Sequence, residues 1–173
     1  PASFTGPMRD MFEYVGPEMD PVNRLVFANL WLTSPVVQSI LEGAPSTNAV
    51  LRTTTAVTQF QGSPQDNVLP KLASAAINFR IHPTDSVEGV FQHVEQTKQD
   101  ERVRINRKRS VFQSEPTPVA EIDHLGFESI QNAVRQVWPQ TIVAPSLTIG
   151  ATDSRHMIDR SKNVLRFAPM ILG

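Results

Sequence analysis

The fold is decided by two strand-like stretches, AVLRTTTAV at residues 49–57 and AAINFRI at residues 75–81, which flank the loop QGSPQDNVLP at residues 61–70. Threonine and other β-branched residues suit a pleated strand, and Gly62, Ser63 and Pro64 supply turn chemistry between the two stretches. We therefore predict an antiparallel hairpin with a long loop. A period of two places Arg80 on the face opposite to the apolar residues at 77, 79 and 81, so Arg80 faces away from the core.

The hairpin also predicts a binding role, because it places Asn67 and Arg80 where they could hold an anion. A guanidinium matches a carboxylate with two parallel hydrogen bonds, which a lysine cannot do. Taken alone, Arg80 could equally be a sheet-surface arginine paired with a neighbouring carboxylate. Asn67 could merely stabilise its loop through an Asx turn.

Helices are predicted on both sides of the hairpin. Asp20 followed by Pro21 reads as an N-cap before a helix at residues 22–30, and Ser34 followed by Pro35 repeats the pattern before a helix at residues 36–42. Residues 84–86 cap a helix at about residues 87–99, and a strand at residues 103–107 follows it. After a proline-stiffened hinge at residues 114–118, we expect a helix at residues 127–137 and strands at residues 141–144 and 164–167.

Composition excludes several classes of protein. The 16 basic and 17 acidic residues nearly cancel, so no global field would attract the chain to nucleic acid or to an acidic membrane. The sequence has no apolar run long enough to span a bilayer, no recognisable signal peptide and no cysteine. We expect a soluble protein, cytoplasmic or periplasmic, with a small-molecule or protein partner.

Two groups of motifs carry a family resemblance. RTTTAVTQF, DNVLP and INFRIHP lie in order between residues 52 and 83, and SLTIGATDSRHM followed by LRFAPM lies between residues 146 and 170. Together they resemble the zinc metallopeptidase family of aminoacylase and Gly-Xaa carboxypeptidase, and most closely its Gly-Xaa carboxypeptidases and N-acyl amino acid hydrolases. The resemblance spans most of residues 30–172.

The resemblance implies an α/β (α+β) architecture. Residues 1–45 would be a helical segment, residues 46–113 an incomplete ferredoxin-like lid or dimerisation domain, and residues 114–173 part of the α/β catalytic domain. It also implies that Asn67, Arg80 and Arg155 bind the substrate's free carboxylate side, with Asp153 orienting Arg155. His82 is then a possible supporting residue behind Arg80, although a structural histidine at a strand end is more common. Asp153 and Arg155 could alternatively be a local ion pair at the start of a helix.

The family's zinc ligands are not found in the sequence. The four histidines at 82, 93, 124 and 156 form neither an HxD nor an HExxH arrangement, and no Cys is present. The chain begins without Met and stops just before the family's late ligand histidine would be expected, so we expect an internal fragment of a longer enzyme. We assign no catalytic and no metal-binding residue to it, and we expect the fragment alone to be inactive.

The resulting hypothesis is a fragment of a zinc-dependent hydrolase that cleaves an amide bond next to a free carboxylate. The parent would be a carboxypeptidase, a dipeptidase or an N-acyl amino acid hydrolase, with a peptide or N-acyl amino acid as substrate and a homodimer formed through the lid. The alternative is a non-catalytic ferredoxin-like module for ligand binding or dimerisation. Zinc ligands elsewhere in the parent sequence would favour the enzyme.

Overall fold

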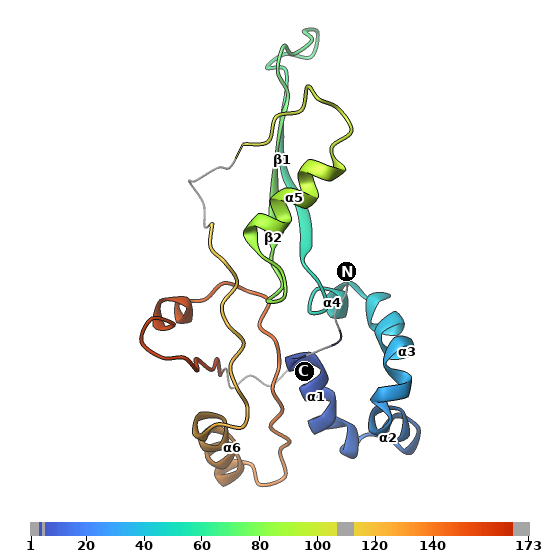
Figure 1. The fold of residues 1–173 in the computed structure, drawn as a ribbon, viewed down its shortest axis with the longest axis vertical. Coiled ribbons are helices and arrows are strands. Elements are labelled where there is room, and N and C mark those ends of the chain that lie inside the picture. The colour runs from blue at the N-terminus through green and yellow to red at the C-terminus, as the bar shows by residue number, and fades with distance from the viewer. Residues whose placement is uncertain (1–3, 5, 107–112, 168–173) are drawn as a thin grey trace. The chain divides into compact units, whose positions relative to one another are not determined.

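The computed structural model describes residue 4, residues 6–106 and residues 113–167 (Figure 1). The chain divides into two compact units: Pro1–Arg52 together with Pro116–Gly173 form unit 1, and Thr53–Glu115 form unit 2. Helices and one two-stranded antiparallel sheet make up the regular structure of the described residues, so the fold is α+β. Unit 1 therefore combines both ends of the chain.

Unit 1 opens with α1 (Pro7–Val15), a 3-10 turn η1 (Gly16–Glu18) and α2 (Pro21–Ala28). The predicted cap of α2 is confirmed: the Asp20 carboxylate accepts hydrogen bonds from the backbone N–H groups of Val22 at 3.1 Å and Asn23 at 3.2 Å. The Asn23 side chain also donates to this carboxylate, and these hydrogen bonds lower the pKa of Asp20 from its ordinary value of 3.8. Proline at the first helical position completes the expected start.

Helix α3 spans Leu30–Glu42, with Pro35 inside it, and the short α4 (Pro45–Asn48) follows. The prediction that this helix begins at residue 36 is therefore wrong. A proline inside a helix costs one backbone hydrogen bond, which tertiary packing of the first turn offsets. Leu30 and Val37 are both buried, one before and one after the proline.

The core of unit 1 lies between these helices. Its buried residues are Phe4, Met8, Phe12, Leu30, Val37 and Leu51. Phe12 stacks on Phe27 with ring centroids 4.5 Å apart, and Tyr14 meets Phe127 of α6 (Leu125–Val137) edge to face at 5.8 Å. Helix α6, predicted at residues 127–137, is confirmed with a start two residues earlier. Aromatic contacts thus join the two chain segments of unit 1.

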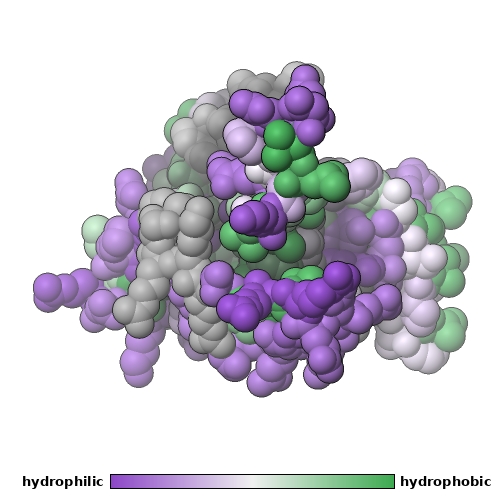
Figure 2. All heavy atoms as spheres, turned by 90° about the horizontal axis from the view of Figure 1, so that it is seen from above, coloured by the Kyte–Doolittle hydropathy of each residue, from purple (hydrophilic) through white to green (hydrophobic). Residues whose placement is uncertain are grey.

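The outer faces of α2 and α3 carry exposed apolar side chains. Val22, Trp31 and Ile40 are 71%, 78% and 69% exposed. Figure 2 shows green apolar residues along its right-hand edge, on the side where Figure 1 places α3. Among the described residues no single helix is long and apolar enough to cross a membrane, although α2 and α3 taken together, bent by 114°, meet the test of length and composition.

Unit 2 contains the predicted hairpin, β1 (Thr54–Gln61) and β2 (Ser74–Arg80), paired antiparallel with an irregularity between Val57 and Gln59. Helix α5 (Val87–Thr97) follows, and the Ser86 hydroxyl caps it by accepting from the Gly89 N–H at 3.0 Å. Both elements were predicted. The expectation that residue 77 faces a core is wrong, because Ile77 is 44% exposed and the hairpin has no third strand beside it among the described residues.

Three predicted strands differ from the structure. Residues 103–106, 141–144 and 164–167 are not strands, and residue 107 lies outside the described part of the chain. A strand requires backbone hydrogen bonds to a neighbour, which an extended, β-branched sequence permits but cannot supply. Of the lid expected from the resemblance, the described residues show the hairpin and one helix.

Candidate substrate-recognition site

Arg80 is the last residue of β2 and lies opposite Thr54, the first residue of β1. Its side chain is exposed, as the period of two predicted. It therefore stands at the base of the hairpin, where the chain enters and leaves the sheet. A guanidinium at a strand end can be held by the backbone on one side and still meet a ligand on the other.

At the base of the hairpin lies a group of four hydrogen-bonded residues, Thr53, His82, Thr84 and Asp85, which we call the Thr53 clasp. The Thr53 hydroxyl accepts from the backbone N–H of His82 at 2.9 Å and donates to the Asp85 carboxylate at 2.5 Å. The imidazole Nδ1 of His82 lies 2.7 Å from the Thr84 hydroxyl and accepts from the Thr84 N–H at 3.3 Å. Because Nδ1 accepts this N–H, the ring proton of a neutral His82 lies on Nε2.

The clasp fixes the chain on both sides of the strand pair. His82 is 8% exposed and is the only buried residue among the described residues of unit 2. Thr53 immediately precedes β1 and His82 follows β2 by two residues. The contacts of His82 are with the Thr53 hydroxyl and with the hydroxyl and N–H of Thr84, and its support of Arg80 stays a prediction.

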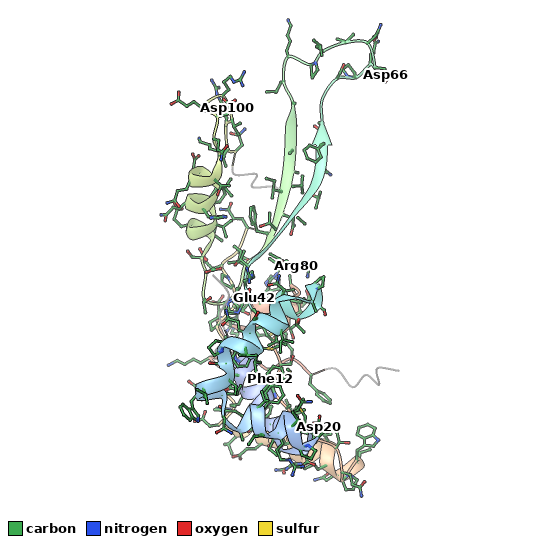
Figure 3. The ribbon with its side chains drawn as sticks, turned by 90° about the vertical axis from the view of Figure 1, so that its right-hand side faces the viewer. Phe12, Asp20, Glu42, Asp66, Arg80 and Asp100 are labelled. Atoms are coloured by element: carbon green, nitrogen blue, oxygen red, sulfur yellow. The ribbon has the colours of Figure 1, made fainter. Side chains whose placement is uncertain are left out.

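Asn67 lies at the opposite end of the hairpin. It occupies an exposed turn in which the Val68 N–H approaches the Gln65 carbonyl at 3.4 Å. The six steps of β2 between Ser74 and Arg80 separate the two ends by about 20 Å, at about 3.3 Å per residue. Figure 3 shows this separation, with Asp66 at the tip and Arg80 at the base. Within the hairpin, six paired residues of β2 lie between Asn67 and Arg80. The binding of one anion by Asn67 and Arg80 together stays a prediction.

Asp153 and Arg155 belong to unit 1, in the 3-10 helix η2 (Asp153–Met157). Thr152 is the N-cap residue of this turn, but its side chain makes no capping bond. The Thr152 hydroxyl instead lies 2.5 Å from the Ser154 hydroxyl. Arg155 Nε donates to His156 Nε2 at 3.2 Å, so these two residues share one side of the turn.

Sequence reasoning missed Arg166. Its Nε donates to the Ser154 hydroxyl at 2.6 Å and its Nη2 to the Thr117 hydroxyl at 3.2 Å. Two of these three segments are also tied by Asn163, which accepts from the Glu121 N–H at 2.7 Å and donates to the Glu121 carbonyl at 3.1 Å. The signal in the sequence was a single arginine in an apolar stretch, LRF, which by itself predicted only a strand.

The zinc implied by the resemblance finds no ligand set here. Among the described residues no three His, Cys, Asp or Glu side chains are grouped so that they could hold a metal ion. Structural and catalytic zinc sites need at least three protein ligands.

Comparison with known proteins gives the family. Residues 17–104 match the model of the peptidase dimerisation domain, M20_dimer. The chain is 41% identical over 168 residues to N-fatty-acyl-amino acid synthase/hydrolase PM20D1 of Xenopus tropicalis, an alignment that covers 96% of this chain and 32% of that protein. It is 38% identical over 164 residues to a probable carboxypeptidase S-like 2 of Dictyostelium discoideum, covering 95% of this chain and 31% of that protein. No solved structure matches it.

The chain thus spans about a third of the length of the curated relatives it matches. The family model covers residues 17–104, which is 88 of the 173 residues and includes the whole hairpin, Arg80 and the Thr53 clasp. The relatives extend the similarity over the η2 turn and Arg166. The chain belongs to the zinc metallopeptidase family of aminoacylase and Gly-Xaa carboxypeptidase, and it carries that family's peptidase dimerisation domain.

Proposed function

We propose that the full-length protein hydrolyses an amide bond next to a free carboxylate, with an N-acyl amino acid as the favoured substrate class and a peptide as the second. The observation that carries this proposal is the 41% identity, across 96% of this chain, to a relative named as an N-fatty-acyl-amino acid synthase/hydrolase. The relative named as a carboxypeptidase supports the peptide. Both substrates share a free carboxylate beside the scissile amide.

Recognition of that carboxylate is assigned to residues of this chain. Arg80 is assigned to it through its planar guanidinium, and Arg155, oriented by Asp153, is a second candidate for this role. Asn67 contacts the substrate from the tip of the hairpin. His82 supports Arg80 through the Thr53 clasp, whose bonds at 2.9 and 2.5 Å fix the strand ends. The zinc that this family uses would be held by residues outside the chain.

Unit 2 is proposed as the lid, and the full-length protein as a homodimer that pairs through it. Val57, Phe60 and Ile77 of the hairpin are 50%, 81% and 44% exposed. An isolated two-stranded hairpin is marginal in water and needs further strands or a helix to cover an apolar face. A complete ferredoxin-like lid, with a further strand and helix from the full-length protein and a second subunit beside it, would supply that cover. The remaining segments, residues 1–45 and 114–173, would then be a helical segment and part of the catalytic domain.

The test is hydrolysis by the full-length protein, purified with zinc. An N-acyl amino acid and the same compound with its carboxylate converted to an amide are supplied in parallel, and released amine is measured. We expect turnover of the acid and a lower kcat/KM for the amide by at least tenfold, the size of a lost charge-assisted contact of about 1.5 kcal/mol. Absence of hydrolysis of N-acyl amino acids and dipeptides alike would favour a non-catalytic binding module instead.

A further inference from the structure

We propose that Arg166 is a positioning residue, which fixes the turn at Thr152–Arg155 by cross-linking it to Thr117 and thereby sets the direction of Arg155. The proposal rests on the proposed function only for the carboxylate that Arg155 would read. The cross-link itself rests on the bonds from Arg166 to Ser154 at 2.6 Å and to Thr117 at 3.2 Å.

The turn depends on ties from elsewhere in unit 1. A five-residue 3-10 helix has poorer hydrogen-bond geometry than an α-helix and does not hold itself in place. Its N-cap residue Thr152 makes no capping bond because its hydroxyl is engaged with Ser154. The preceding residues 141–149 form no regular structure that could restrain it. Side chains that reach the turn from other segments can therefore add to its restraint.

Arg166 supplies such a restraint through the two hydrogen bonds that it donates. A guanidinium can only donate, so the Ser154 oxygen accepts from Arg166 Nε, and the same hydroxyl shares a second hydrogen bond with the Thr152 hydroxyl. The second arm of the fork reaches Thr117, 49 residues earlier in the chain. Three segments of unit 1 are thus held by one rigid, planar group, and Arg155 is the residue that directly follows Ser154.

The partners of Arg166 are neutral. Within the described part of the chain no carboxylate oxygen lies within 4 Å of its nitrogen atoms, whereas Arg9, Arg52 and Arg102 each pair with an acid. Its positive charge is therefore not cancelled beside the turn. Arg166 could hold the turn in two ways: through the planar geometry of its guanidinium, as proposed, or through its positive charge alone. A lysine at this position keeps the charge and loses the fork, so it separates the two.

The experiment compares Arg166→Gln, Arg166→Lys, Arg155→Gln and the double variant R155Q/R166Q in the full-length protein, with Arg135→Gln on α6 as the control for an exposed arginine of the same unit. Hydrogen exchange is followed at the amides of residues 151–157. We expect both substitutions of Arg166 to speed this exchange at least about fivefold, and Arg135→Gln to leave it unchanged. Unchanged exchange in Arg166→Gln would overturn the cross-link.

Kinetics then test the link to Arg155. With an N-acyl amino acid, Arg166→Gln should raise KM about tenfold and change kcat less than twofold, and Lys should not restore it. In the Arg155→Gln background the further change should be absent, because residues that act through one another are not additive. Additive effects, or full activity in Arg166→Lys, would overturn the positioning role. If the wild type hydrolyses no such substrate, the proposed function fails, and the exchange result alone decides the role of Arg166.

Discussion

Substitution of Thr53 by Val should loosen the base of the hairpin while preserving its shape. Valine has nearly the volume of threonine but no hydroxyl, so it removes both bonds at the centre of the clasp. The backbone N–H of buried His82 then loses its acceptor at 2.9 Å, and the Asp85 carboxylate loses its donor at 2.5 Å. Both groups lie next to the strand ends that carry Arg80.

The size of the effect follows from the two bonds. A neutral hydrogen bond to a backbone group contributes about 1 kcal/mol, and a bond to a charged group about 1.5–3 kcal/mol. Asp85 is only half-buried, so water can replace part of its lost partner, and the lower end of that range applies. The expected loss in the free energy of opening of unit 2 is about 2–3 kcal/mol. That corresponds to exchange about 30- to 150-fold faster at the hairpin amides, since 1.36 kcal/mol is a factor of ten.

Native-state hydrogen exchange of β1 and β2 measures this directly in the full-length protein. Thr53→Ser keeps the hydroxyl and should change exchange less than about fivefold. Thr58→Val is the matched control on the same strand, because its hydroxyl makes one exposed bond to the Ala76 carbonyl at 3.3 Å. If Thr53→Val and Thr58→Val had equal effects, the clasp would contribute nothing beyond an ordinary surface hydroxyl, and the reasoning would be refuted.

Other outcomes can be measured on the same material. In the full-length protein, Arg80→Lys should lower kcat/KM for a substrate with a free carboxylate about ten- to a hundredfold, with zinc content and folding nearly unchanged. If the variant and the wild type discriminated equally against the amidated substrate, Arg80 would not bind the carboxylate. The 173-residue chain by itself should neither bind stoichiometric zinc nor hydrolyse peptides, and metal analysis that finds tight zinc together with hydrolysis would contradict this. Light scattering should find the full-length protein as a dimer, and an active monomer at micromolar concentration would argue against pairing through the lid. Hydrogen bonds from Asn23 and the backbone lower the pKa of Asp20, so its stabilisation of α2 is present above the ordinary pKa of 3.8 and is lost as pH falls through the lowered value. The Asp20→Ala variant should therefore be less stable than wild type at pH 7. The difference between their unfolding midpoints should shrink at pH 2.

Features that depend on neighbours in sequence were predicted well. The Asp20 cap and the Ser86 cap each arise from residues a few positions apart, and the hairpin has local signals in its β-branched strands and its turn residues. The start of α3 was misplaced for the opposite reason. Packing of Leu30 in the core extends that helix through Pro35 against the local preference for a stop. The three strands that were predicted but are not formed would likewise have needed partner strands, and the local sequence does not specify those partners.

The candidate site likewise has features that the local sequence predicts and features that depend on distant contacts. The period of two predicted the exposed face of Arg80 but not the exposure of Ile77, which was expected on the core side. The residues that hold the site in place were not predictable, because Thr53 meets Asp85 and His82 across 32 and 29 residues, and Arg166 meets Thr117 across 49. In each case a hydroxyl that looks like ordinary strand or loop composition makes a hydrogen bond to a residue far along the chain. A residue type selected for ligand chemistry can be read from sequence, whereas a residue that positions another is recognisable only from the contact it makes. For this reason the variants of Thr53 and Arg166 are the sharpest test of function. They distinguish a hairpin and a turn that recognise substrate from a hairpin and a turn that are ordinary surface.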